Sequence, residues 1–401
     1  MAFKRVGRSV ALNAFAAVAG LAGTFYIVWF FGLSEFAYFT INSAKLALLL
    51  LAGELLPSNF SIFRLQDDPR FASAAPVYYL GLALCAAAAA AALETTGLFA
   101  HASWWMVLFV FSSAIQRYFD TQAQASGRVD AFFLIPAASS VVRLLLLVGF
   151  SQLTSWEVPD IIWASVAIGS FLGQALMITR FPEFFSRESY RKPVGKLHYL
   201  WSIRGAYYGY YANSVLKRLR DTFLPLFCDL AIPSKAEIGR LLVFIRANEA
   251  VCGQVRVLEA FMVNRAVREN LRHHRRQIFW TIGLFGQMAV AVIALALMYR
   301  HGIGSVDVML ALATGAFIYP YILEIFWRND ALAAFRPRQV TFSLVAFLAG
   351  LAIPPLSAFA LGSVNIPLMI FSYILGQTLA AATYRLFPGS RSDVSASERR
   401  A

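Results

Sequence analysis

Long apolar segments alternate with short polar connections along the whole chain. A helix that crosses a lipid bilayer needs about 20 mostly apolar residues, and twelve segments of the 401-residue sequence approach this condition. They cover residues 9–32, 36–57, 76–94, 102–119, 131–151, 159–179, 203–231, 237–261, 278–299, 307–327, 339–360 and 364–386. The pattern predicts an all-α integral membrane protein with twelve transmembrane helices.

The basic residues divide the connections into two classes. Of the 35 Lys and Arg residues, 25 lie at the chain ends or in alternate connections, three lie in the remaining connections, and seven lie inside the apolar segments. Lys and Arg accumulate on the cytoplasmic side of membrane proteins. We therefore expect a multi-pass protein with both termini in the cytoplasm.

The longest of the basic connections, residues 180–204, separates six apolar segments from six others. A short similarity supports this division, because Glu35-Phe-Ala-Tyr and Glu237-Ile-Gly-Arg stand 202 residues apart. Each half has an even number of segments and starts on the same side, which favours a parallel pseudo-two-fold repeat. The predicted domains are an N-terminal six-helix bundle with the link (1–190), a C-terminal six-helix bundle (191–386) and a cytoplasmic tail (387–401).

Composition and motifs restrict the function. Charged residues make up 14% of the chain, against roughly 25% in soluble domains, and the net charge of +13 is accounted for by a basic fringe facing membrane lipid. We therefore expect no nucleic-acid partner. The three Cys residues have no metal-binding spacing, and no nucleotide-binding or hydrolase motif is present. These observations predict no metal, no cofactor and no enzymatic activity.

The most informative stretch is 213–225, which carries four charges inside an apolar segment, at Lys217, Arg218, Arg220 and Asp221. A charge at bilayer depth costs about 3 kcal/mol on insertion scales, so these residues should face a partner or a water-filled cavity. Four tyrosines precede the stretch, at Tyr207, Tyr208, Tyr210 and Tyr211. They are interpreted either as rings that stack on sugars or as an interfacial aromatic belt.

Basic residues outnumber acidic ones among the central charges, which suits an anionic substrate. A diphosphate bound to a sugar is the obvious candidate, because guanidinium groups bind phosphate oxygens through two parallel hydrogen bonds. The predicted substrate-binding residues are Lys45, Arg143, Lys217, Arg220, Asp221, Arg246, Glu249 and Arg256. The alternative is internal pairing, of Asp221 with Arg246 and of Glu249 with Arg246 or Arg256.

Arg143 is a special case among these charges, because only apolar residues flank it on its own segment. Its side chain is expected to point across the bundle, toward other helices. Together, Lys217, Arg220, Arg246 and Arg143 are expected to line one central cavity, with Asp221 pairing at least one of them.

With its two sets of six segments, the chain resembles the multidrug/oligosaccharidyl-lipid/polysaccharide exporter superfamily, and within it the bacterial polysaccharide flippases of the O-antigen type. The resemblance rests on Ser9-Val-Ala-Leu-Asn-Ala-Phe, the turn Phe31-Gly-Leu-Ser-Glu-Phe-Ala-Tyr, and the charged seventh segment ending in Arg220-Asp221 before Glu237-Ile-Gly. It implies a V-shaped pair of bundles in the bacterial inner membrane that work by alternating access. It also implies a polyprenyl-diphosphate-linked oligosaccharide as substrate, a role in surface polysaccharide (lipopolysaccharide O-antigen) biosynthesis, and glycosyltransferases or a polymerase of that pathway as partners.

Other functions remain open at this point. The first segment has Asn13 and no carboxylate, which argues against the acidic first-helix site of the drug-exporting branch, but a cation-coupled drug exporter of the same fold is the main alternative. A cavity-facing carboxylate in the first half would favour it. A membrane glycosyltransferase or polymerase would need an acidic pair at the outer surface. A non-transporting scaffold would have its cavity closed by packed Leu and Phe.

Overall fold

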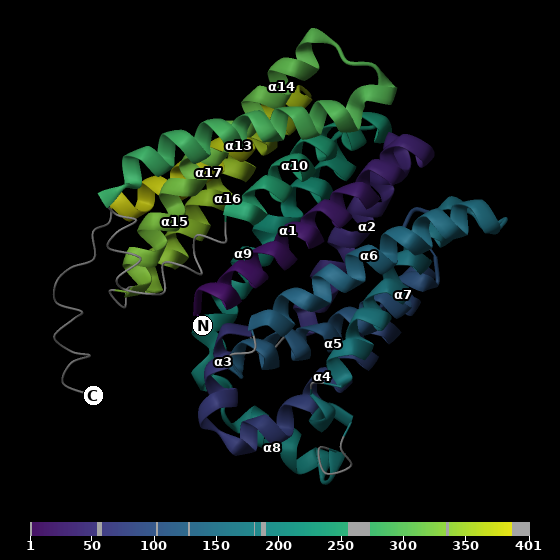
Figure 1. Ribbon diagram of the computed structural model, residues 1–401, viewed down its shortest axis with the longest axis vertical. Coiled ribbons are helices and arrows are strands. Elements are labelled where there is room, and N and C mark those ends of the chain that lie inside the picture. Colours follow the sequence, from purple (N-terminus) through teal and green to yellow (C-terminus); the bar gives the residue numbers. More distant parts are fainter. Residues whose placement is uncertain are drawn as a thin grey trace. The chain divides into compact units, whose positions relative to one another are not determined.

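Every regular element in the described part of the chain is a helix (Figure 1). Contacts divide the chain into two compact units, Met1–Arg218 and Leu219–Ala401, which we call unit 1 and unit 2. The computed structural model describes residues 2–53, 58–101, 103–126, 129–179, 181–185, 190–255, 273–333 and 337–386.

Unit 1 contains all six apolar segments predicted for the first half. They correspond to α1 (Ala2–Tyr26) with its π-helical end η1 (Ile27–Phe31), α2 (Leu33–Gly53), α4 (Pro69–Glu94), α5 (Trp105–Ala125), α6 (Val129–Leu153) and α7 (Val158–Ile178). Gly32 makes the sharp turn between η1 and α2 with φ of 98°, a value that residues with a Cβ rarely adopt. Three short helices were not predicted: α3 (Ser58–Asp67), η2 (Pro182–Phe185) and α8 (Pro193–Ser202).

The predicted segments of the second half are also helices. They are α9 (Arg204–Ala231), within which the boundary between the units falls, α10 (Lys235–Val255), α13 (Arg275–Met298) with η4 (Tyr299–His301), α14 (Ser305–Gly315), α15 (Ile318–Ala333), α16 (Pro337–Ala360) and α17 (Ile366–Leu386). The tenth segment is thus two helices. Pro320 stands in the first turn of α15, where a backbone N–H would have no partner within the helix. In the interior of one continuous helix, the same proline would remove a backbone hydrogen bond, so α14 ends before it. The predicted end of the eighth segment, residue 261, lies outside the described residues.

The helices differ in how apolar they are. Among the described residues, eight candidate spans are long and apolar enough to cross a membrane: α1 with η1, α4, α6, α7, α13 with η4, α14 with α15, α16 and α17. The other four of the twelve predicted spans are α2, α5, α9 and α10, of which α9 and α10 are the most polar of the described spans. The protein is therefore a multi-pass membrane protein whose in-span charges are concentrated on a few helices.

The two units repeat the same helix pairings. In unit 1, α4 contacts α2 and α5, and α7 contacts α5 and α6; in unit 2, α13 contacts α10 and α15, and α17 contacts α15 and α16. The starts of α2 and α10, at Leu33 and Lys235, are 202 residues apart, the offset of the sequence similarity. These pairings agree with the internal repeat predicted from the sequence, but the close pairing of α1 with α6 has no equivalent between α9 and α16 among the described residues, so the repeat itself stays a prediction.

The helix α8 packs against α4 in unit 1. Its Tyr199 hydroxyl donates a hydrogen bond to Asp68, which caps α4 by accepting from the backbone N–H groups of Arg70 and Phe71. Burial, together with this hydrogen bond, raises the pKa of Tyr199 to about 12. This packing places α8 in unit 1. The contact boundary at residue 218 falls later than the predicted domain boundary at residue 190, and the domain division itself stays a prediction.

Topology can be tested with reporter fusions. We expect fusions at 94–103 and 360–367 to report an external position and fusions at 191–196 and 273–276 to report a cytoplasmic one. The reason is that 25 basic residues lie on the predicted cytoplasmic side and three on the predicted external side. Alkaline phosphatase and green fluorescent protein activities measure the two outcomes. Cytoplasmic signals from both supposedly external loops would overturn the twelve-span topology.

Candidate functional site

Two charges of α9 form an ion pair in unit 2. The Nε atom of Arg220 lies 3.0 Å from Oδ1 of Asp221, and the side chains are 16% and 46% exposed. The guanidinium carbon of Arg220 also lies 5.5 Å from the ring centroid of Phe347 on α16. The expectation that Asp221 pairs with one of the central basic residues is confirmed, although its partner is its own neighbour and not Arg246.

The neighbouring helix α10 carries a second pair. Nη1 of Arg246 lies 3.1 Å from Oε2 of Glu249, and both side chains are about half exposed, at 47% and 48%. The amide of Asn248, which is buried, donates to the hydroxyl of Tyr373 on α17 at 3.3 Å. The pairing of Arg246 with Glu249 is one of the two arrangements predicted from their spacing on the helix.

Aromatic rings connect these pairs. Tyr373 stacks on Phe317 with 4.2 Å between ring centroids and meets Phe347 edge-on at 6.3 Å. Through Asn248, the residue before Glu249, Tyr373 also contacts α10. We call the residues Arg220, Asp221, Arg246, Glu249, Phe347 and Tyr373 the arginine–aromatic cluster.

In unit 1, the side chain of Arg143 on α6 points across the bundle toward α2, as expected for a charge flanked by apolar residues on its own helix. Its guanidinium carbon lies 5.1 Å from the ring centroid of Phe39 on α2, and that ring contacts Trp163 of α7 at 5.0 Å. Gly169 allows α7 to approach α6 closely at Arg143, because a Cβ at residue 169 would lie only 3.2 Å from the Cβ of Arg143. Arg143 is therefore fixed between α2 and α7.

Lys45 has a structural contact. Its ammonium group donates to the carbonyl oxygen of Leu98 at 2.9 Å, and the nearby Asn42 amide donates to the carbonyl oxygen of Ala100 at 2.7 Å. Both bonds tie the connection after α4 to α2. To bind a substrate as predicted, the Lys45 ammonium group would have to give up its hydrogen bond to the Leu98 carbonyl oxygen.

The remaining predicted residues are only partly described. Lys217 is exposed and Tyr211 is half-buried. Arg256 lies outside the described residues, as do the side chains of Tyr207, Tyr208 and Tyr210. That Lys217, Arg220, Arg246 and Arg143 line one central cavity stays a prediction.

The structure contains a buried polar network that the sequence analysis did not predict. Glu324 of α15 is held by Arg328, with Nη1 2.9 Å from Oε1, and by Gln377 of α17, whose Nε2 donates to Oε2 at 2.7 Å. Glu324 and Gln377 are buried. In the sequence, only the i, i+4 spacing of Glu324 and Arg328 indicated that these two side chains pair.

Carboxylates also occur in unit 1. Asp120, near the end of α5, accepts a hydrogen bond from Gln116 at 2.8 Å. At the opposite ends of the helices, Asp160 accepts from Ser103 at 2.6 Å, and Glu35 lies 3.1 Å from His101. Each of these three carboxylates thus has a partner of its own. No three His, Cys, Asp or Glu side chains in the described ranges converge on a possible metal position.

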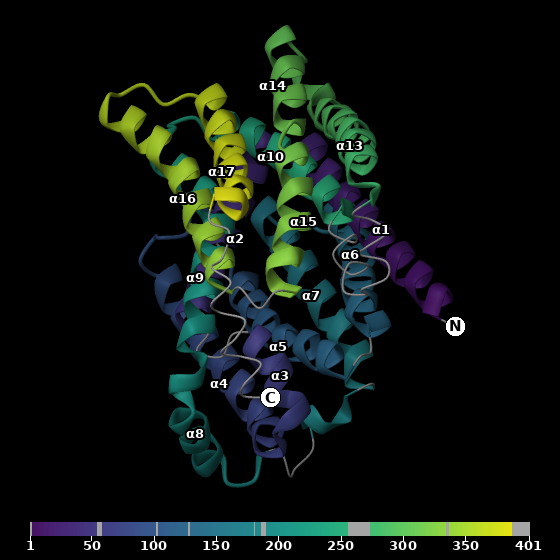
Figure 2. The same ribbon diagram turned by 90° about the vertical axis from the view of Figure 1, so that its left-hand side faces the viewer.

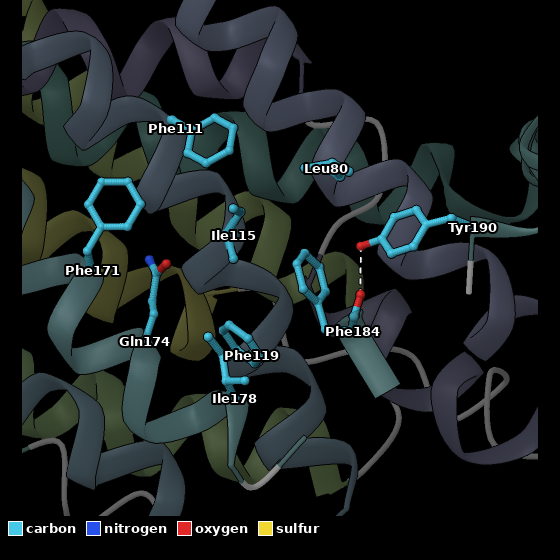
Figure 3. A pocket seen from close by; sticks show the side chains of 9 residues that line it. All are labelled: Leu80, Phe111, Ile115, Phe119, Phe171, Gln174, Ile178, Phe184 and Tyr190. Atoms are coloured by element: carbon cyan, nitrogen blue, oxygen red, sulfur yellow. Dashed lines mark hydrogen bonds between the residues drawn. The ribbon is translucent and has the colours of Figure 1, made fainter. Parts of the chain in front are cut away.

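Unit 1 also has an open pocket of about 370 Å³ (Figure 3). The Tyr190 hydroxyl donates to the Phe184 carbonyl oxygen at 2.7 Å, and burial raises the pKa of Tyr190. As far as the described residues go, no charged side chain lines the pocket, so it suits an apolar group and not a diphosphate. Its lining is Leu80, Phe111, Ile115, Phe119, Phe171, Gln174, Ile178, Phe184 and Tyr190.

No protein-family model and no curated protein matches the sequence. Solved structures match nearly the whole chain. An inward-facing multidrug resistance MATE family transporter of the MOP superfamily has a TM-score of 0.64 at 12% identity, over 98% of this chain and 99% of that one. The chain has the MATE transporter fold.

Two further MATE transporters support this fold. The bent form of VcmN from Vibrio cholerae has a TM-score of 0.53 at 13% identity, over 96% of this chain and 95% of that one. The eukaryotic AtDTX14 has a TM-score of 0.51 at 12% identity, over 98% and 97%. The predicted fold class, twelve helices in two bundles, is confirmed.

Proposed function

We propose that this protein is a flippase that moves a polyprenyl-diphosphate-linked oligosaccharide across the bacterial inner membrane by alternating access, for surface polysaccharide biosynthesis. The observation that carries the proposal is that an in-span arginine lies over an aromatic ring in each unit, Arg143 over Phe39 and Arg220 over Phe347. Guanidinium groups bind phosphate oxygens in a fork, and aromatic rings offer apolar faces to sugars. The MATE transporter fold supports membrane transport.

The ion pairs of the arginine–aromatic cluster are compatible with this role. Pairs that are partly open to solvent are worth about 0–1 kcal/mol, and Arg246 and Glu249 are 47% and 48% exposed. A doubly charged diphosphate could therefore compete with Glu249 for the Arg246 guanidinium at small cost. The same holds for Arg220, whose partner Asp221 is 46% exposed.

The setting of the proposed flippase follows from the charge distribution. The 25 basic residues on one side predict that both termini are cytoplasmic. The substrate would enter from the cytoplasmic leaflet, with its polyprenyl tail in the lipid and its head group bound by the arginines. Glycosyltransferases and a polymerase of the same pathway are the proposed partners.

A cation-coupled drug exporter is the second candidate. One similar solved structure is a multidrug resistance transporter, and Asp120 and Glu324 are carboxylates inside helices α5 and α15. In such an exporter a carboxylate would bind the coupling cation. Glu324, however, is already bonded to Arg328 and Gln377, and Asp120 lies near the end of α5 and not at its centre.

The two functions can be separated in proteoliposomes. We expect the purified protein to move a polyprenyl-diphosphate-linked oligosaccharide with a fluorescent sugar between leaflets, so that an impermeant reductant bleaches the label beyond the half exposed at the start. In the same vesicles, an imposed proton or sodium gradient should drive no accumulation of cationic dyes. Gradient-driven dye transport without movement of the labelled lipid would refute the flippase proposal and establish the exporter.

A further inference from the structure

Two arginines from different helices of unit 2 lie over one tryptophan ring. The guanidinium carbon of Arg275, the first residue of α13, is 4.9 Å from the ring centroid of Trp327 on α15. That of Arg385, in the last turn of α17, is 5.8 Å from the same centroid. Because α15 contacts both α13 and α17 (Figure 2), three helices meet at this ring.

The surroundings of Trp327 are positively charged. The described ends of α13, α15 and α17 near this ring carry four arginines and two carboxylates: Arg275, Arg276, Arg328 and Arg385 with Glu324 and Asp330. Glu324 is buried and already bonded to Arg328 and Gln377. The excess of positive charge lies with the outer arginines, of which Arg385 is exposed and Arg275 is half-buried.

The position of this group along the helices points to the membrane surface. Arg275 begins α13 and Arg385 stands one residue before the end of α17, ends that the distribution of basic residues predicts to be cytoplasmic. Trp side chains favour the head-group level of a bilayer, and the cytoplasmic leaflet is rich in anionic lipids. Guanidinium groups bind phosphate oxygens, and the two guanidinium carbons lie 4.9 and 5.8 Å from the same ring centroid.

We propose that Arg275, Arg385 and Trp327 form a binding site for the phosphate of an anionic phospholipid head group. The two guanidinium groups would bind the phosphate oxygens, and the indole ring would hold both arginines in place through cation–π contacts. The site differs from the arginine–aromatic cluster, and it is independent of which substrate the transporter carries.

The proposal can be tested on the full-length protein in a neutral detergent. Binding of phosphatidylglycerol with a fluorescent tail is followed by anisotropy. Unlabelled phosphatidylglycerol should compete, whereas phosphatidylcholine and millimolar inorganic diphosphate should not. Competition by diphosphate as strong as that by phosphatidylglycerol would instead identify a site for soluble phosphates and overturn the lipid assignment.

Variants locate the site. Replacing both arginines, Arg275→Gln with Arg385→Gln, should weaken phosphatidylglycerol binding by about fivefold for each charge removed. The matched control is Arg276→Gln with Arg338→Gln, which removes two exposed arginines from helix starts on the same predicted side. An equal loss in the control would show only a general attraction to the basic surface, and the proposed site would be wrong.

Two more variants keep the test decisive if the double variant does not fold. Replacing both arginines with lysine keeps the charge but loses the planar fork, so monodisperse Arg275→Lys with Arg385→Lys protein should retain part of the binding and bind more tightly than the double Gln variant. Replacing Trp327→Leu keeps both arginines but removes the ring that orders them, and it should weaken binding by several fold. Unchanged binding in monodisperse Trp327→Leu protein would contradict the ordering role of the ring.

Discussion

Replacing Arg220 with alanine is expected to reduce translocation of the lipid-linked oligosaccharide by about 10- to 100-fold. The change removes a charge-assisted hydrogen-bonding group worth about 1.5–3 kcal/mol. Surface polysaccharide should be lost while the amount of protein in the membrane stays the same, because Asp221, the partner left behind, is 46% exposed and remains solvated. Flipping in proteoliposomes and immunoblots of membranes measure the two quantities.

Companion variants separate charge from geometry. Arg220→Lys keeps the charge but loses the planar fork, so it should restore only part of the activity. Lys235→Ala is a matched control, because Lys235 forms a similar pair with Asp229 (2.5 Å) between α9 and α10, away from the arginine–aromatic cluster; it should transport normally. If Arg220→Ala fails to accumulate in the membrane, the pair is structural and the substrate role loses its support.

Much of the fold was predictable because burying a helix in lipid demands a long apolar run. That requirement marks α4, α7 and α17 clearly. Hydropathy does not indicate α3 or α8, because these helices need not cross a bilayer and lie in polar stretches of the sequence. The start of α8 at Pro193 carries a usable signal, since proline is favoured at the first position of a helix.

The candidate site was predictable where the partners lie on one helix. Arg246 and Glu249 are three residues apart and therefore neighbours on the helix surface. Arg220 and Asp221 are adjacent in sequence and point in different directions from the helix axis, so their contact depends on the flexibility of the arginine side chain. Sequence spacing alone did not favour this pair over Asp221 with Arg246.

Contacts between distant segments could not be predicted at all. Gln377 bonds to Glu324 across 53 residues, and nothing in the apolar surroundings of either residue indicates the other. Phe39 and Arg143 are likewise brought together only by the packing of α2, α6 and α7. Such pairs depend on the tertiary arrangement, which hydropathy and helical periodicity do not specify.

The second large effect is expected at the buried network of unit 2. Replacing Glu324 with alanine should destabilise the protein by about 3 kcal/mol, the lower end of the range for breaking a buried ion pair. The side chain of Glu324 is 4% exposed and that of Arg328 is 19% exposed, so the variant removes a buried acceptor from a largely buried guanidinium and from the Gln377 amide. Thermal unfolding in detergent should show a clearly lowered Tm.

A matched control exists on α10. The pair of Arg246 and Glu249 has the same chemistry and similar helical spacing, but both side chains are about half exposed. Glu249→Ala should therefore change stability by less than about 1 kcal/mol. Equal losses of Tm for Glu324→Ala and Glu249→Ala would show that burial does not determine how much each pair stabilises the protein.

The double variant Glu324→Leu with Arg328→Met carries the argument further. Apolar residues of similar size often replace a buried pair without loss of stability, so the double variant should be more stable than Glu324→Ala despite its additional change. Its transport then tests the role of the pair. A stable double variant that still moves the labelled lipid gives Glu324 and Arg328 a structural role, whereas a stable one that moves no lipid would make this pair part of the transport cycle.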